Sequence, residues 1–201
     1  MEKRTGIFEG KDPFELARRW MSEAVAGELN DPNAMALSTV DGDGMPNARI
    51  VLLKSIEDNA FVFYTNYESK KANEAFGAGK AAFVIHWKSL RRQIRCRGVV
   101  EREDGPLADK YFMSRSPLSR VGAVASEQSK VLVARSVLMD RVAALKAEYG
   151  ETMTRPDFWG GVRIRPLELE FWADGEARLH DRFRWVRSSQ DADWTVDRLY
   201  P

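Results

Sequence analysis

Residues 34–55 read AMALSTVDGDGMPNARIVLLKS, and this stretch decides the fold class. Two largely apolar runs, Ala34 to Val40 and Asn47 to Ser55, flank the turn sequence Asp41-Gly42-Asp43-Gly44. Turn residues between two runs of this kind predict an antiparallel β-hairpin. The chain is therefore expected to build its core from strands that follow one another closely.

Strand patterns continue on the C-terminal side of this hairpin. Aromatic and β-branched runs predict strands at residues 61–65, 80–87 and 91–103, and we expect them to join the hairpin in an antiparallel meander. After an intervening helical region, strand patterns return at residues 161–165, 167–172, 177–185 and 194–199. The expected fold class is mainly β with α additions, an α+β protein.

Helix signals occupy three places. Asp12-Pro13-Phe14-Glu15 combines an N-cap Asp, a Pro at the first helical position and a Glu three residues after the cap. We expect this helix to run to about Gly27. A second helix is predicted over residues 107–114, and a longer one from about Gln128 to Tyr149, where Gly150 suits the C-terminal cap.

The composition fits a globular protein. The chain has 201 residues, 44% of them hydrophobic, and its net charge of +1 argues against a dedicated nucleic-acid binder. No apolar run reaches membrane-spanning length, and residues 1–11 lack the apolar stretch of a signal peptide. The lone Cys96 favours a reducing compartment, so we expect a cytoplasmic protein. We expect an N-terminal tail over residues 1–11 and a single domain over residues 12–201.

Several familiar chemistries lack the residues that they need. Gly42-x-Gly44 lies between two strands, and Asn47 stands where a dinucleotide fingerprint requires its third glycine. Gly77-Ala78-Gly79-Lys80 lacks the spacing of a P-loop. His86 and His180 are the only histidines, which excludes a multi-histidine metal site, and no nucleophile elbow supports hydrolysis.

The segment Arg178-Leu179-His180-Asp181-Arg182-Phe183 is the first candidate site. In an extended strand, Arg178, His180 and Arg182 would share one face and form an anion site. Arginines also coat solvated strand faces, so this row alone leaves both interpretations open.

Other cations form a second candidate. A barrel that places Arg49, Lys54, Lys71 and Arg182 near one another would need a multiply charged anion, and a phosphate ester is the common biological choice. Each cluster taken singly could also be a solvated charged face. Arg49 and Lys54 are five residues apart and should face opposite sides of a regular strand, so we expect a bulge or contacts with different ends of the ligand.

Short strings spread through the chain resemble the pyridoxamine (pyridoxine) 5′-phosphate oxidase family from about Asp12 to Pro201. They are, in order, Arg49-Ile50-Val51-Leu52-Leu53-Lys54, Phe63-Tyr64-Thr65-Asn66, Ser69-Lys70-Lys71-Ala72, Arg92-Gln93, Tyr111-Phe112-x-Ser114-Arg115, Ser119, Gln128-Ser129, Phe158-Trp159-Gly160-Gly161, Glu170-Phe171-Trp172 and Arg178-Leu179-His180-Asp181-Arg182-Phe183. The resemblance implies an FMN-binding split β-barrel of the antiparallel Greek-key type and a homodimer with FMN at the interface. It also implies oxidation of pyridoxamine or pyridoxine 5′-phosphate to pyridoxal 5′-phosphate, with O2 as acceptor and H2O2 as product.

The resemblance also implies roles for individual residues. The cofactor-binding set is Arg49, Ile50, Val51, Leu52, Leu53, Lys54, Tyr64, Thr65, Lys70, Lys71, Gln93, Gln128, Ser129, Trp172 and Arg182. The substrate-binding set is Lys54, Tyr111, Arg115, Ser119, Arg178 and His180, of which Arg178 and His180 would hold the pyridine ring over the flavin.

The chain departs from the family pattern at two places. Lys70 stands where family members usually carry Arg, and an ammonium group cannot reproduce a bidentate guanidinium contact with phosphate. Residues 1–11 contain no tyrosine, although the family's N-terminal tail often supplies one to the substrate. The alternatives are another split-barrel flavin oxidoreductase and a non-catalytic module that binds flavin or pyridoxal phosphate.

Overall fold

A six-stranded antiparallel barrel forms the centre of the protein, in a computed structural model that describes residues 4–201. The helices are α1 Pro13–Gly27, α2 Lys70–Ala78, α3 Pro106–Ser114, α4 Pro117–Ala125 and α5 Arg135–Tyr149, with 3-10 turns η1 Gly6–Phe8 and η2 Glu176–Arg178. The strands are β1 Ala34–Val40, β2 Pro46–Ile56, β3 Phe61–Asn66, β4 Lys80–Trp87, β5 Arg92–Glu103, β6 Trp159–Ala173, β7 Asp181–Val186 and β8 Thr195–Leu199.

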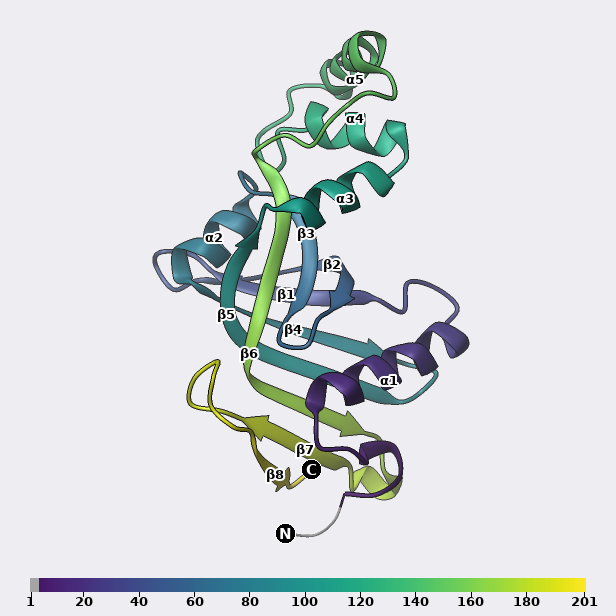
Figure 1. The fold of residues 1–201 in the computed structure, drawn as a ribbon, viewed down its shortest axis with the longest axis vertical. Coiled ribbons are helices and arrows are strands. Elements are labelled where there is room, and N and C mark those ends of the chain that lie inside the picture. Colours follow the sequence, from purple (N-terminus) through teal and green to yellow (C-terminus); the bar gives the residue numbers. More distant parts are fainter. Residues whose placement is uncertain (1–3) are drawn as a thin grey trace.

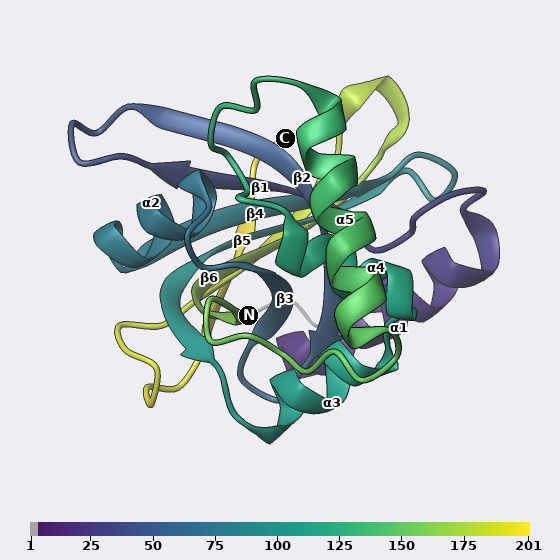
Figure 2. The ribbon, with the colours of Figure 1, turned by 90° about the horizontal axis from the view of Figure 1, so that it is seen from above.

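The strand order is β3-β2-β1-β4-β5-β6-β7-β8, and an additional pairing between β3 and β6 closes the barrel. The first half of β6 pairs with β3, whereas its second half pairs with β7, so β7 and β8 extend the sheet beyond the barrel. Figure 1 shows the consequence: α3, α4 and α5 lie at one end of the molecule, and β7 and β8 lie at the other. Figure 2, seen from above, shows α4 and α5 in front of the barrel strands.

The core lies inside the barrel and under α1. Asp12 caps α1 by accepting a hydrogen bond from the Phe14 N–H, and Pro13 occupies the first turn, as the sequence predicts. The buried face of α1 carries Phe14, Leu16 and Trp20, which pack on barrel residues. Full burial of such side chains contributes about 1.5–3 kcal/mol each, so this helix is an integral part of the core.

The predicted hairpin is confirmed. β1 and β2 pair antiparallel from Ala34↔Leu52 to Val40↔Pro46, and the Asp41 carboxylate accepts hydrogen bonds from the backbone N–H groups of Asp43 and Met45 in the turn. The predicted bulge also exists, since the register with β3 shifts between Leu53 and Ser55. It lies at Lys54 itself.

Some strand predictions need correction. The predicted meander is wrong, because β1 pairs with β4 on the edge opposite to β2, and β3 pairs with β6. Residues 161–165 and 167–172 are parts of one continuous strand, β6, because Pro166 pairs with Gly98 at a register shift that tolerates proline.

The helical region also differs from the prediction. The long helix begins at Arg135 and not near Gln128, because Ser129 has a left-handed backbone (φ 76°) and residues 128–134 form a loop. The helix α4 was not predicted, although Ser116 caps it and Pro117 opens it.

The described part of the N-terminal tail is packed against the domain. Phe8 is buried between Trp20 and Phe183, and Arg19 donates hydrogen bonds to the carbonyl groups of Ile7 and Glu9. The tail residues 1–3 lie outside the described residues. Within residues 4–201, no helix is both long enough and apolar enough to cross a membrane.

Candidate functional site

A cavity of about 590 Å³ opens between β2, β3 and the helices α3 and α4. Many of the predicted site residues line it: Ile50, Val51, Leu52, Lys54, Tyr64, Thr65, Lys71, Tyr111, Arg115, Ser119 and Gln128. Trp159 at the start of β6 lines it as well. The fold therefore unites predicted cofactor-binding and substrate-binding residues from segments that are far apart in the sequence.

A stack of aromatic rings supports the cations of this cavity. The rings of Tyr64 and Tyr111 lie 4.0 Å apart and nearly parallel, and Trp159 lies parallel to both, 5.6 Å from Tyr64. The guanidinium of Arg115 lies 5.0 Å from the centre of the Trp159 ring, and Lys54 Nζ lies 6.0 Å from that of Tyr111. These are distances at which cation–π attraction operates.

The guanidinium group of Arg115 lacks part of its hydrogen bonding. Its Nη1 atom is buried and has no hydrogen-bond partner among the described residues. Burial lowers the pKa of the Arg115 guanidinium, because desolvation disfavours the charged form. A buried donor of this kind is stabilised by an anion that enters the cavity.

Lys71 forms a second cationic group in the same cavity. Its Nζ lies 2.6 Å from Gln128 Oε1, 3.1 Å from Thr65 Oγ1 and 3.2 Å from Ser69 Oγ. Burial, and secondarily the charge of Arg49, lower the pKa of Lys71 to about 8. Because its partners are neutral oxygens, Lys71 keeps its full positive charge available to a ligand when it is protonated.

Arg49 does not line this cavity. It points to the opposite face of β2, where its guanidinium donates to Thr39 Oγ1 at 2.5 Å and to Glu74 Oε2 at 3.0 Å. The carboxylate of Glu74 is nearly buried, and Lys70 Nζ lies 3.8 Å from its Oε1. As their separation of five residues predicts, Arg49 and Lys54 face opposite sides of β2. The Glu74 carboxylate offsets the repulsion between the positive charges of Arg49 and Lys70.

Three other predicted residues lie beside the cavity. Leu53 is buried in the core, with 3% of its surface exposed. Lys70 and Ser129 line a neighbouring pocket, where the Lys70 backbone N–H donates to Ser129 Oγ at 3.1 Å.

The remaining predicted residues form a second group at β5, β6 and β7. Strand register places Gln93 opposite Trp172, and Trp172 opposite Arg182. The His180 ring lies 4.7 Å from the Trp172 ring. Arg182 donates to Glu170 Oε1 at 2.9 Å from Nε and to the Tyr200 carbonyl at 3.0 Å from Nη1. These residues form a polar surface around one tryptophan.

The prediction that Arg178, His180 and Arg182 alternate along one strand is wrong. Only Arg182 belongs to β7, which begins at Asp181; Arg178 ends the 3-10 turn η2, and His180 lies in the connection between them. Ala177 and Arg178 have left-handed backbone angles (φ 52° and 65°), which no strand accommodates. Arg178 and His180 are therefore placed by a tight loop after β6, and Arg182 by strand β7.

The two groups of predicted residues lie apart in one chain. The first is held by α3, α4 and the adjoining parts of β2 and β3, and the second by β7 and the end of β6, which Figure 1 shows at the opposite end of the molecule. The expected proximity of Arg182 to Lys54 and Lys71 is not found within the chain, because the barrel separates their strands.

Sequence reasoning missed four residues that organise these groups. Trp159 stacks on Tyr64, and three carboxylates lie against predicted site residues: Glu74 pairs with Arg49, Glu170 pairs with Arg182, and Asp174 lies 3.1 Å from His180. Trp159 and Glu170 occur in the strings that carry the family resemblance, which is a signal for them. Glu74 and Asp174 had no such signal, because their contacts depend on tertiary packing.

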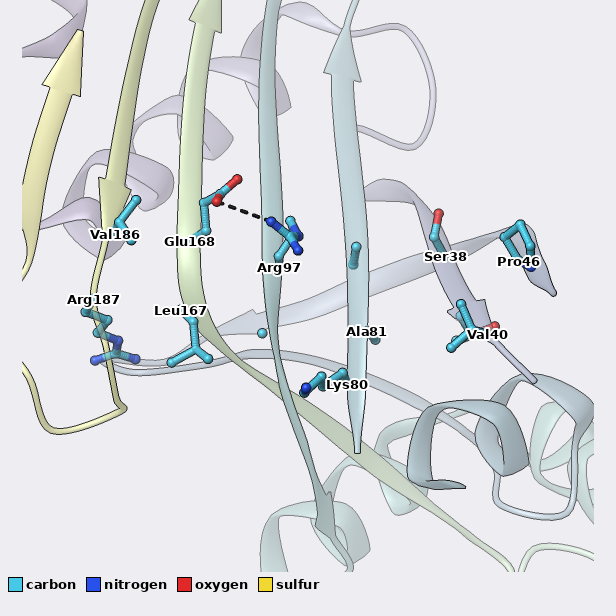
Figure 3. Close-up of a pocket in the computed structure, with 13 residues that line it drawn as sticks. Ser38, Val40, Pro46, Lys80, Ala81, Arg97, Leu167, Glu168, Val186 and Arg187 are labelled. Atoms are coloured by element: carbon cyan, nitrogen blue, oxygen red, sulfur yellow. Dashed lines mark hydrogen bonds and ion pairs between the residues drawn. The ribbon is translucent and has the colours of Figure 1, made fainter. Parts of the chain in front are cut away.

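A separate cavity of about 430 Å³ lies on the sheet between β1, β4, β5, β6 and β7. Figure 3 shows Lys80, Arg97, Glu168 and Arg187 around it, with an ion pair between Arg97 and Glu168 at 3.4 Å. It contains none of the predicted site residues, so the cavity at α3 and α4 is the candidate site.

The candidate site can hold a flat, phosphate-bearing ligand. Lys54, Lys71 and Arg115 supply positive charge, and Thr65 and Ser119 supply hydroxyl groups. The apolar side chains of Ile50 and Leu52 are exposed on the same wall, which suits an aromatic ring system.

Comparisons with known proteins identify the family of the chain. A family model described as "Pyridoxamine 5'-phosphate oxidase" matches residues 21–149, and one described as "Pyridoxine 5'-phosphate oxidase C-terminal dimerisation region" matches residues 159–201. Proteins named pyridoxine/pyridoxamine 5'-phosphate oxidase are 63% identical in Roseobacter denitrificans over 100% of both chains, and 57% identical in Paracoccus denitrificans, again over 100% of both chains.

Solved structures share the fold. PhzG from Burkholderia lata, in complex with tetrahydrophenazine-1-carboxylic acid, matches with a TM-score of 0.89 and 33% identity over 96% of this chain and 94% of its own. An FMN-binding protein of Nostoc punctiforme related to pyridoxamine 5'-phosphate oxidase matches with a TM-score of 0.75 and 17% identity over 98% of this chain and 100% of its own, which supports the fold alone. The predicted split barrel is thus confirmed.

Proposed function

The chain belongs to the pyridoxamine 5′-phosphate oxidase family, and on that premise we propose that it oxidises pyridoxamine and pyridoxine 5′-phosphate to pyridoxal 5′-phosphate with FMN as cofactor. O2 is the electron acceptor and H2O2 the second product. The observation that carries this proposal is the cavity in which Arg115, with an unpartnered buried nitrogen, lies beside Lys54, Tyr111 and Ser119. This donor set fits the dianionic phosphate of the substrate.

The FMN phosphate belongs at the other end of the cavity. Lys71, Thr65 and Gln128 converge there, and Lys71 Nζ contacts the oxygens of both neighbours. The exposed side chains of β2 would flank the isoalloxazine ring. When bound, FMN supplies the two-electron chemistry that these side chains lack.

The residues of the chain itself would bind and orient the substrate. Lys54, Tyr111, Arg115 and Ser119 fix the substrate phosphate, and Trp159 keeps the Arg115 guanidinium in place through ring contact. Arg178 and His180 hold the pyridine ring, and holding two reactants in a fixed geometry contributes much of the rate.

A homodimer would complete the site. Within one chain, β7 and the end of β6 lie at the opposite end of the molecule from α3 and α4 (Figure 1). We therefore propose that a second protomer supplies the residues of this group, which are Gln93, Trp172, Arg178, His180 and Arg182. The match of residues 159–201 to a dimerisation region supports this arrangement, because all but Gln93 lie in that segment.

The test is anaerobic addition of pyridoxamine 5′-phosphate to the purified, FMN-loaded protein while the flavin absorbance is followed. Bleaching in a single turnover, with recovery and H2O2 formation after O2 is admitted, is the expected result. A flavin that binds but is not bleached would favour the non-catalytic module. Bleaching by tetrahydrophenazine-1-carboxylic acid and not by either vitamin phosphate would instead favour a substrate like the compound bound to PhzG.

A further inference from the structure

A carboxylate outside the proposed binding sets lies against His180. Asp174 follows the last residue of β6, and its Oδ1 lies 3.1 Å from His180 Nδ1. Only 16% of the Asp174 side chain and 22% of the His180 side chain are exposed. We propose that Asp174 is a positioning residue that keeps neutral His180 protonated on Nδ1, so that Nε2 accepts a hydrogen bond from the substrate. This inference rests on the proposed function, in which His180 meets the substrate.

Asp174 is itself held from two directions. Its backbone N–H donates to the Arg91 carbonyl at 3.0 Å, and its Oδ2 forms an ion pair with the Arg91 guanidinium. Arg91 lies in the turn between β4 and β5. The carboxylate is therefore fixed by a neighbouring turn, and its Oδ1 remains directed at the imidazole.

The His180 ring is also confined. Trp172 packs against it at 4.7 Å, and the loop that carries it folds back so closely that a Cβ on Gly175 would lie 2.0 Å from the Leu179 carbonyl oxygen. The ring and the carboxylate consequently meet in one geometry, which is the condition for a carboxylate to select a tautomer.

Two groups compete for Nδ1. The Gly175 N–H lies 3.2 Å away and can donate to an unprotonated Nδ1, whereas Asp174 Oδ1 can accept from a protonated one. An unprotonated Nδ1 would direct its lone pair at a carboxylate, and a hydrogen bond to a charged acceptor is stronger than one between neutral groups. The difference favours the Nδ1–H tautomer roughly tenfold. Within residues 4–201, Nε2 has no hydrogen-bond partner and is free to accept one from a ligand.

Histidine ring nitrogens labelled with ¹⁵N test the tautomer in the FMN-loaded protein. The chain has two histidines, so a His86→Gln variant assigns the His180 signals. At an alkaline pH where both rings are neutral, the wild-type His180 should carry its proton on Nδ1. Asp174→Ala should move the proton toward Nε2 and change the tautomer ratio roughly tenfold. Asp174→Asn is nearly isosteric, and should move the ratio in the same direction even if the Ala variant does not fold.

The matched control is Asp181→Asn. Asp181 is the next residue after His180 and forms an ion pair with Arg198, so this variant removes a nearby negative charge without touching Nδ1. Its tautomer ratio should equal that of the wild type. A wild-type proton on Nε2, or a ratio that neither Asp174 variant changes, would overturn the proposal.

Kinetics separate this inference from the proposed function. Asp174→Asn should lower kcat/KM for pyridoxamine 5′-phosphate roughly tenfold while the Kd for FMN stays unchanged, because the lost interaction orients the substrate and not the cofactor. A wild-type protein that shows the Nδ1–H tautomer but oxidises neither vitamin phosphate would reject the proposed function and leave the role of Asp174 intact. An unchanged kcat/KM in an active enzyme whose tautomer has shifted would reject the role of Nε2 toward the substrate.

Discussion

Lys71 is a half-buried cation whose hydrogen-bond partners, within residues 4–201, are all neutral. Its pKa of about 8 means that it loses its charge in a pH range where the phosphate of a flavin remains a dianion. Binding of a phosphate favours the protonated amine, so binding above pH 8 must take up a proton. In the proposed site, the affinity for FMN would thereby be linked to pH through one side chain.

We expect the Kd for FMN to rise with pH above about 8, by at most tenfold per pH unit. Lys71→Arg should flatten this dependence, because guanidinium stays charged. Quenching of flavin fluorescence measures the Kd across the range. An equally steep rise in the Lys71→Arg variant would assign the dependence to another group.

The same shift has a consequence for the cofactor-free protein. The folded pKa of Lys71, about 8, lies below its ordinary value of 10.5, so the unfolded chain binds more protons between these values. Lys71 should therefore make the free energy of unfolding increase as pH rises from about 8 to 10.5. Urea titrations of Lys71→Met should lack this contribution, whereas a contribution of the same slope in the variant would contradict it.

Arg115 should determine selectivity for the phosphate ester. A charge-assisted hydrogen bond contributes about 1.5–3 kcal/mol, so Arg115→Ala should lower kcat/KM for pyridoxine 5′-phosphate about ten- to hundredfold. Oxidation of free pyridoxine, which lacks the phosphate, should hardly change. Lys110→Ala, on the exposed side of α3, is the control and should alter neither rate. Equal losses on both substrates would remove Arg115 from the phosphate site.

At the scale of elements, the pairing of β5 with β6 at their register shift depends on a glycine. The register shifts between Arg97 and Gly98, and a Cβ on Gly98 would lie 2.2 Å from the Arg165 carbonyl oxygen. The atoms that such a Cβ would meet belong to the backbone, so no side-chain rotation can relieve the clash. The close approach lets one long strand serve both the barrel and the β7–β8 extension.

Gly98→Ala should destabilise the protein by about 1–3 kcal/mol or more. Gly77 is the matched control, because it lies inside α2 with nothing within 4 Å of its would-be Cβ. Gly77→Ala should raise stability by about 0.5–1 kcal/mol. Thermal unfolding should therefore show Tm shifts in opposite directions for the two variants. Shifts of the same sign would contradict the role of Gly98 at the register shift between β5 and β6.

At the scale of the whole molecule, the residues of the proposed site form two separate groups within one chain. The cavity group at α3 and α4 and the Trp172 group at β7 lie at opposite ends, so one protomer cannot use both on one ligand. A two-fold dimer would bring the two groups together twice, giving two equivalent sites.

This arrangement predicts complementation between inactive variants. Arg115→Ala damages the cavity group and Arg178→Ala the Trp172 group. In a refolded equimolar mixture, half the dimers are mixed, and each mixed dimer contains one undamaged site, which gives about a quarter of wild-type activity. Mixing either variant with itself is the control and should restore nothing. No recovery in mixtures that contain mixed dimers would show that each site is built within one protomer.

The sequence by itself determined the local elements of this protein. The N-cap of α1, the turn after β1 and the position of most strands follow from short-range patterns, because capping and turn formation involve neighbouring residues. The residues around the candidate cavity were predicted as well, through a family resemblance carried by short strings. No periodicity in the chain would have united Lys54 with Arg115.

The tertiary structure alone decided which strands pair and which side chains meet. The closure of β3 on β6 and the pairing of β1 with β4 join segments whose local patterns do not encode their partners. The left-handed Ala177 and Arg178 broke a strand that the sequence pattern favours, because the loop packs back on Gly175. The contacts of Glu74 with Arg49 and of Asp174 with His180 exist for the same reason: side chains that hold a site in place are brought there by long-range packing.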